Sequence, residues 1–148
     1  MLSAPHDPLL FRPTPRVISA KAETGPKNID IAMDVNLELE GGMTARMSCA
    51  MKKESVISAT FSARGERGEL RVINPIAPHR GHQLTVKTNA GEKSETVPGE
   101  TTFTHQLRAF LKAVRGEAKF PTDGAEGVIN MRVIDDVYRA AGLPPRAT

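Results

Sequence analysis

The sequence has few aromatic residues and almost no cysteine. Its 148 residues include no tryptophan, one tyrosine and one cysteine, and aromatic residues make up only 4% of the chain. A single cysteine excludes a disulfide framework and predicts a reducing, cytoplasmic location. Basic and acidic residues are interspersed at a net charge of +3. With so few rings for base stacking, this composition argues against nucleic-acid binding.

Long apolar runs are also missing. No stretch approaches the ~20 apolar residues that a membrane helix requires, and the N-terminus lacks a basic-then-apolar signal, so we expect no membrane association. A hydrophobic content of 39% with 25% charged residues is typical of a globular protein. The length suits one domain, which we place at residues 16–148. Residues 1–15 contain four prolines and are predicted to be a connector.

The clearest pattern runs from Ile31 to Met51. Odd positions are apolar on both sides of Gly41-Gly42, with polar residues between them, which predicts two strands of a hairpin. Directly opposed residues share a face, so Leu39 should lie opposite Met43. This register requires a three-residue loop, Glu40-Gly41-Gly42, with a glycine at positive φ.

Strand patterns precede helix patterns in the rest of the chain. From Thr101 the apolar period becomes 3.6, which predicts one helix capped by Thr102 or Thr104 and stopped by Gly116, and a second from Thr122-Asp123 to Ala141. The order predicts an α+β fold: an open-faced, mostly antiparallel β-sheet with two C-terminal helices packed on one face. The other predicted strands are Arg16–Ala22, Val56–Phe61, Gly68–Ile73, Gln83–Thr88 and Lys93–Val97, and charged residues from Arg64 to Gly68 predict an exposed turn.

The two faces of the hairpin have different expected roles. We expect the helices to bury the odd face, including Val35, Leu37, Met47 and an unreactive Cys49, against Leu107, Phe110, Ile134 or Val137. The even face is short and polar. Its register places Asn36 opposite Arg46, with Asp34 and Glu38 diagonal to the arginine and Ser48 nearby. Such a face is either solvated or a contact surface for another flat sheet.

Few residues indicate chemistry on their own. The sequence contains no dinucleotide or phosphate-binding glycine motif, no GxSxG, no HExxH and no cysteine pair. His79 and His82 share a Pro/Gly loop without nearby acidic or cysteine ligands, so we predict no metal site and expect them to brace the loop. His105 and Gln106 are better candidates for binding. They fall in the first turn of the first helix, where backbone N–H groups and the helix dipole favour polar ligands.

Five stretches together resemble the C-terminal half of Gfo/Idh/MocA-type oxidoreductases, in the branch of D-xylose and dihydrodiol dehydrogenases. They are Asn74–His82, Thr104–Phe110, Thr122–Ala125, Met131–Asp135 and Tyr138–Pro144. Members of this family are NAD(P)-dependent sugar, inositol and diol dehydrogenases. They combine a Rossmann domain with an α+β domain that lines the substrate site and commonly packs its sheet against a partner subunit.

The resemblance covers the second half only. The dinucleotide fingerprint and the stretch with the family's catalytic lysine are absent, and residues 1–15 look like the remnant of the linker between the halves. We therefore expect a truncated or split member that binds no cofactor and is not catalytic alone. NAD(P) is implied for the complete enzyme, together with a separately encoded Rossmann domain as partner.

The resemblance also implies roles for the candidate residues. His105 and Gln106 would face a sugar- or diol-like substrate, and Asp34, Asn36, Arg46 and Ser48 would form a homodimer interface. One alternative is a binding or regulatory module that has kept the fold without the chemistry. Another is an unrelated enzyme that uses His79, His82 or His105.

Overall fold

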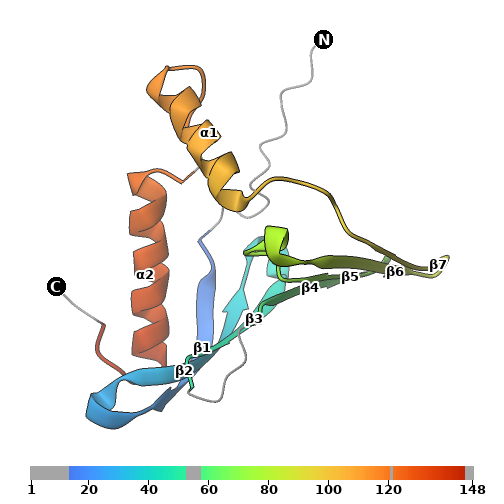
Figure 1. Cartoon of the computed structure of the whole chain (residues 1–148). Helices are drawn as coiled ribbons and strands as arrows, with labels where there is room; N and C mark the ends of the chain where they lie inside the picture. The colour runs from blue at the N-terminus through green and yellow to red at the C-terminus, as the bar shows by residue number, and fades with distance from the viewer. Residues whose placement is uncertain (1–13, 53–57, 121, 146–148) are drawn as a thin grey trace. The chain divides into compact units, whose positions relative to one another are not determined.

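The computed structural model describes residues 14–52, 58–120 and 122–145. It confirms the α+β class, with antiparallel strands and two helices near the C-terminus (Figure 1). The strands form two sheets, in the orders β1-β2-β3 and β4-β5-β6-β7. The chain divides into two compact units, β1–β3 with α2 and β4–β7 with α1. The elements are β1 Arg16–Thr24, β2 Asp30–Glu38, β3 Thr44–Ala50, β4 Thr60–Gly65, β5 Gly68–Ile73, β6 Gln83–Thr88, β7 Gly91–Glu95, α1 Thr102–Val114 and α2 Gly124–Ala140, with 3-10 turns η1 Pro26–Asn28, η2 Glu40–Gly42 and η3 Pro78–Arg80.

The register predicted for the β2–β3 hairpin is confirmed. Leu37 lies opposite Ala45 and Asn36 opposite Arg46. The loop is the three-residue turn η2, closed by a 2.8 Å hydrogen bond from the Leu39 N–H to the Met43 carbonyl. Both glycines of the loop have positive φ, 75° and 76°, which side-chain-bearing residues adopt at a cost.

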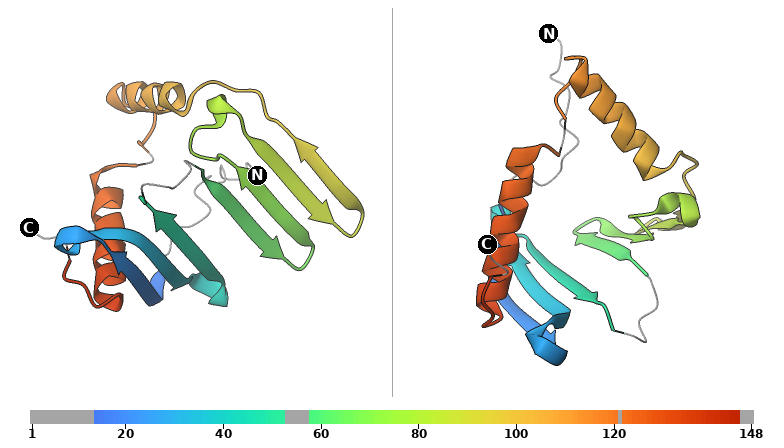
Figure 2. Two further views of the ribbon diagram at one scale, coloured as in Figure 1. Left: turned by 60° about the horizontal axis from the view of Figure 1, so that its bottom comes forward. Right: turned by 60° about the vertical axis from the view of Figure 1, so that its left-hand side comes forward.

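The core of the first unit lies between this sheet and α2 (Figure 2). Val35 is fully buried, and Met33 and Val137 are nearly so. The Tyr138 hydroxyl donates a 2.8 Å hydrogen bond to Asp30 Oδ1, which ties the C-terminal turn of α2 to the start of β2. Partly buried residues complete the cluster, namely Val17, Ala20, Ala22, Leu37, Ala141 and Leu143.

Two residues expected in this core are exposed. Met47 retains 47% of its accessible surface and Cys49 is also exposed, so their predicted burial is wrong. The helix packs over β1, and the buried cluster stops at β2. A helix about 10 Å wide covers roughly two strands spaced about 4.8 Å apart. The apolar odd face of β3, the edge strand of this sheet, therefore extends past α2.

An irregularity in β1 sets which of its residues reach the core. Val17 pairs with Leu37, but the next pairs are Ser19 with Asn36 and Ala20 with Val35. Ile18 is the extra residue of a β-bulge, and it is half exposed. The bulge reverses the parity of the strand, so that Val17 and Ala20 lie on the same, apolar face.

The second unit is an antiparallel meander in which two strands are displaced from their predicted positions. β4 begins at Thr60 and ends at Gly65, whereas the prediction was Val56–Phe61, of which residues 56–57 lie outside the described part. β7 spans Gly91–Glu95, not Lys93–Val97. The exposed turn shrinks to Glu66-Arg67, because Gly65 pairs with Gly68. A Cβ on Gly68 would lie 2.1 Å from the Lys87 carbonyl oxygen, so only glycine fits.

Both helices end as predicted, but α1 begins one residue earlier than its predicted caps. Thr101 is the N-cap, and its hydroxyl accepts a 3.1 Å hydrogen bond from the Thr104 N–H. Asp123 caps α2 by accepting from two backbone N–H groups. Gly116 and Gly142 follow the helices at φ of 71° and 73°, in the Schellman arrangement. Among the residues that the structure describes, no helix is long and apolar enough to cross a bilayer.

The burial pattern predicts how β2 and β3 differ in sensitivity to truncation. Val35→Ala should lower the free energy of unfolding by about 2–3 kcal/mol, since it removes two methyl groups and leaves a cavity. Met47→Ala, on the same face of β3 but exposed, should cost about 0.5 kcal/mol or less. Urea titration followed by the fluorescence of Tyr138, the one tyrosine and a residue of this unit, measures both. Equal losses would contradict the assignment of the core.

Candidate functional site

The even face of the first sheet brings together the four residues predicted for a dimer interface. We call Asp34, Asn36, Arg46 and Ser48 the Arg46 surface. The register places Asp34 opposite Ser48 and Asn36 opposite Arg46. The Ser48 hydroxyl donates to Asp34 Oδ1, and Arg46 Nη2 lies 3.6 Å from the same oxygen. The predicted diagonal pairing of Arg46 with Asp34 is therefore present.

Strand β1 adds two residues that the sequence analysis did not assign to this surface. The Asn36 amide donates a 2.9 Å hydrogen bond to Ser19 Oγ, and Lys21 lies opposite Asp34. Counting positions along β1 would have placed them correctly only if the bulge at Ile18 had been recognised. Their alternation, polar at 19 and 21 and alanine at 20 and 22, was the available signal.

The Asp34 carboxyl is held in its ionised form. The hydrogen bond from Ser48, and then the positive charges of Arg46 and Lys21, lower the pKa of Asp34 below its ordinary value, against a smaller opposing effect of desolvation. The folded protein therefore favours the carboxylate. Its contribution to stability is complete above the unfolded-state pKa and is lost as the pH falls through the folded-state pKa.

Removing the Ser48 hydroxyl should reverse the largest part of this effect. In Ser48→Ala, the pKa of Asp34 should rise toward its ordinary value, as measured by NMR titration of the side-chain carboxyl carbon. Acid unfolding of the variant should lose less stability between neutral pH and the folded-state pKa. Ser62→Ala, a matched change on β4, should leave Asp34 unaltered. An unchanged titration of Asp34 in Ser48→Ala would contradict the hydrogen bond.

The second pair of candidates, His105 and Gln106, lies near the start of α1. Because Thr101 is the N-cap, the His105 N–H is already bonded to the Thr101 carbonyl at 3.2 Å and is not free to bind a ligand. Both side chains are exposed. Any contact with a ligand would therefore come from the imidazole and the amide. The ligand role of these residues stays a prediction.

Gln106 borders a small apolar hollow on α1. The hollow has a volume of about 290 Å³, and Phe110 and Phe120 meet edge to face in it with ring centroids 6.1 Å apart. Aromatic walls with one convergent amide resemble the lining of small-molecule sites, which are mostly apolar with few polar groups. The residues around the hollow are Phe103, Gln106, Leu107, Phe110 and Phe120.

Asn74 organises the loop that carries the other histidines. It adopts a positive φ of 54°, and its amide nitrogen donates to the carbonyls of Ala77 and Gly81 at 2.9 and 2.7 Å. The sequence analysis treated this residue only as part of a Pro/Gly loop. Asparagine is the commonest non-glycine residue type at positive φ, which was the signal available for it.

His82 braces this loop, as expected. Its Nδ1 lies 2.9 Å from the Pro78 carbonyl, and its Nε2 accepts a 2.9 Å hydrogen bond from the Val97 N–H. The proton must therefore be on Nδ1, and neither nitrogen has a free lone pair for a metal. Within residues 14–52, 58–120 and 122–145, no three His, Cys, Asp or Glu side chains are grouped to hold a metal ion.

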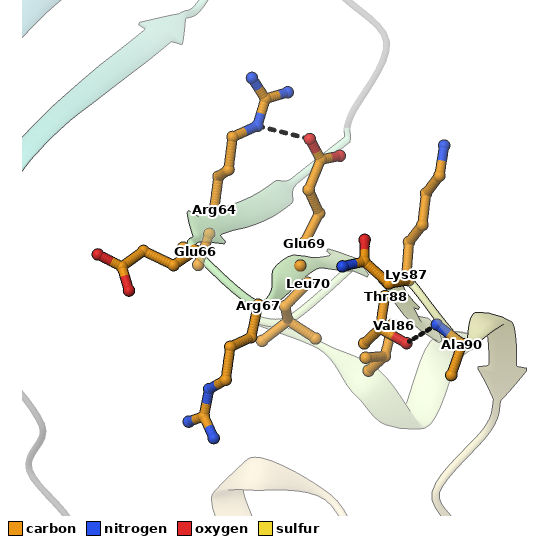
Figure 3. Close-up of a pocket in the computed structure, with 13 residues that line it drawn as sticks. Arg64, Glu66, Arg67, Glu69, Leu70, Val86, Lys87, Thr88 and Ala90 are labelled. Carbon is orange, nitrogen blue, oxygen red and sulfur yellow. Dashed lines mark hydrogen bonds and ion pairs between the residues drawn. The ribbon is translucent and has the colours of Figure 1, made fainter.

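The largest hollow of the second unit lies at the hairpin ends of its sheet and has a volume of about 860 Å³ (Figure 3). Figure 3 shows Leu70 and Val86 on the side of the sheet that faces this hollow, and Arg64, Glu69 and Lys87 on the opposite side. Arg64 Nε lies 2.5 Å from Glu69 Oε1. These residues were predicted to be a solvated turn, but the structure places Arg64 and Glu69 within paired strands.

Comparison with known proteins finds sugar-active oxidoreductases. The chain is 27% identical over 133 residues to D-xylose 1-dehydrogenase (NADP(+)) 2 of Haloferax volcanii, a match that covers 89% of this chain and 41% of that enzyme. No protein-family model matches. The chain thus spans about two fifths of the length of this relative.

Solved structures share the fold at low sequence identity. The aldose-aldose oxidoreductase of Caulobacter crescentus, complexed with glycerol, matches with a TM-score of 0.75 at 20% identity, over 86% of this chain and 39% of that one. KijD10, a 3-ketoreductase of Actinomadura kijaniata in complex with NADP and TDP-benzene, matches with a TM-score of 0.70 at 16% identity, over the same shares. At these identities the likeness establishes the fold.

Proposed function

We propose that this chain, which has the fold of the C-terminal domain of Gfo/Idh/MocA-type oxidoreductases, supplies the substrate-binding and dimer-forming part of an NAD(P)-dependent enzyme acting on a sugar-like or diol substrate. The observation that carries the proposal is the match over 89% of the chain to a D-xylose dehydrogenase. The matched region is 41% of that enzyme. Cofactor binding and hydride transfer are therefore assigned to a Rossmann domain, whether in a longer chain or a separate one.

The proposed substrate contacts are His105 and Gln106. An imidazole and a primary amide can each donate and accept hydrogen bonds, which suits the hydroxyl groups of a sugar or diol. Both side chains are exposed, and Gln106 borders the aromatic hollow of α1. A cytoplasmic location is part of the same proposal, since the exposed thiol of Cys49 would stay reduced there.

The Arg46 surface is the proposed dimer contact. Its side chains are short apart from Arg46, and Asp34 neutralises that guanidinium through the 3.6 Å contact. A small, internally neutral patch can approach a copy of itself closely without like-charge repulsion, as a two-fold interface requires. A stable interface of this kind needs roughly 800 Å² per subunit.

The substrate assignment predicts where a sugar binds. Titrating the ¹⁵N-labelled chain with D-xylose should shift the backbone and side-chain resonances of Gln106 and the ring signals of His105. NADP⁺ should produce no saturable shift up to high micromolar concentration, since the chain lacks a glycine-rich pyrophosphate turn. A His105→Ala/Gln106→Ala double variant should lose the xylose response.

Matched controls separate specific from general effects. His79→Ala changes an exposed histidine outside α1 and should keep the response to D-xylose. Xylose-induced shifts that persist in the His105/Gln106 double variant would reject these residues as contacts. Micromolar binding of NADP⁺ by the chain would reject the division of roles between two domains.

The dimer assignment predicts the effect of one bulky substitution. Ser48→Arg places a long cationic side chain beside Arg46 and removes a hydrogen bond to Asp34. The wild-type chain should sediment as a dimer at tens of micromolar, and Ser48→Arg as a folded monomer, with folding checked by circular dichroism. Asn36→Arg serves if the first variant does not fold.

Ala118→Arg is the control for this test. It adds the same side chain to an exposed turn after α1 and should leave the dimer intact. A wild-type chain that stays monomeric would overturn the dimer, while leaving the substrate assignment to stand or fall on the titration.

A further inference from the structure

The four-stranded sheet carries a row of charges that alternate in sign. The register places Arg64 of β4, Glu69 of β5, Lys87 of β6 and Glu92 of β7 side by side. All four are exposed, and Arg64 and Glu69 form an ion pair at 2.5 Å. The order across the sheet is therefore positive, negative, positive, negative.

The remainder of this face is polar. The next row is Ser62, Arg71, Thr85 and Ser94, in which Thr85 and Ser94 are hydrogen-bonded at 2.8 Å. Figure 3 shows Arg64, Glu69 and Lys87 pointing to this side, away from Leu70 and Val86. We call the two rows together the charged face. The long apolar side chains lie on the reverse side of the sheet, except for Ile73 at the end of β5.

The alternation makes this face complementary to a copy of itself. A two-fold axis along the strands, between β5 and β6, places the first strand of one copy over the fourth strand of the other. Arg64 then faces Glu92 of the second copy, and Glu69 faces Lys87 of the second copy. In the next row Arg71 faces a threonine hydroxyl, which can accept from it. No like charges meet in either row.

The geometry of sheets is compatible with this arrangement. Packed sheets of the aligned class keep their strand directions within about 30° of each other, so the axis need only lie close to the strands. Four strands at about 4.8 Å and six residues at about 3.3 Å give a flat face of roughly 400 Å². That is about half of what one partner contributes to a standard interface, so the charged face would set register in a dimer that other contacts also stabilise.

We propose that the charged face is a self-complementary contact surface whose occupant is a second copy of this chain. The inference rests on the proposed function only in taking the chain to dimerise. It names a different surface from Asp34, Asn36, Arg46 and Ser48, and different pairs of residues. Complementary charges fix register and exclude wrong partners more than they add affinity.

A charge-swap experiment tests the pairing. In Glu69→Lys the substituted side chain faces Lys87 of the second copy, so two lysines meet, and in Lys87→Glu two glutamates meet at the same contact. Each variant alone should dimerise at least about tenfold more weakly than the wild type in sedimentation equilibrium, because like charges meet twice in a two-fold contact. An equimolar mixture should form heterodimers at close to wild-type affinity, since both contacts again join opposite charges. Native mass spectrometry with one chain ¹⁵N-labelled identifies them.

The controls use the opposite face and the outer pair of the row. Lys93→Glu changes the same charge on β7, on the side of the sheet facing away from the row, and should leave the dimer constant unchanged. Circular dichroism checks folding. If Glu69→Lys or Lys87→Glu does not fold, Arg64→Glu and Glu92→Lys test the outer contact in the same way, singly and mixed.

The outcomes separate this inference from the proposed dimer. A wild-type chain that is monomeric overturns both. A dimer that Ser48→Arg disrupts, but that the charge reversals leave unchanged, overturns the charged face alone. Reversals that weaken the dimer without rescue in the mixture also overturn it, because the loss then reflects damage within each chain.

Discussion

The three-residue loop of the β2–β3 hairpin determines which side chains of the first sheet can form a core and which can form a contact surface. Side chains alternate between faces with a period of two, so a loop shorter by one residue would have moved every residue of β3 to the opposite face. With Glu40-Gly41-Gly42 in the turn and both glycines at positive φ, Leu39 meets Met43. Val35 is then buried beneath α2, while Asp34, Arg46 and Ser48 meet on the other side.

Patterns confined to one strand pair or one helix were predictable from the sequence. The hairpin register followed from parity, and the ends of both helices followed from Gly116, Asp123 and Gly142, because local backbone chemistry decides them. Burial was less predictable, since it depends on the width of the covering element. Parity placed Met47 on the same face as Val35 correctly, but it could not show that α2 lies over β1 and leaves β3 uncovered.

Features that depend on pairing between distant segments were missed. The charges from Arg64 to Glu69 are common in turns, yet strand pairing with Lys87 and Glu92 keeps two of them on a sheet face. His82 illustrates the same limit at a candidate site. A histidine three residues from another suggests a metal ligand, but hydrogen bonds to Pro78 and Val97 occupy both ring nitrogens. The position of His82 opposite Val97 follows from the strand register, which the loop sequence does not contain.

Charge balance links the contact surfaces argued for the two units. A two-fold contact places a face against its own copy, so a face with a large net charge would repel itself. The chain as a whole carries +3. On the even face of β1–β3, however, three basic and three acidic side chains balance, with Arg16 bonded to Glu38 and Arg46 near Asp34. The other two charges on that face are Lys21 and Glu23. The row from Arg64 to Glu92 is likewise neutral, with two charges of each sign. Solvation alone favours exposed charges without requiring that they balance within each face, whereas contact between identical copies does require it.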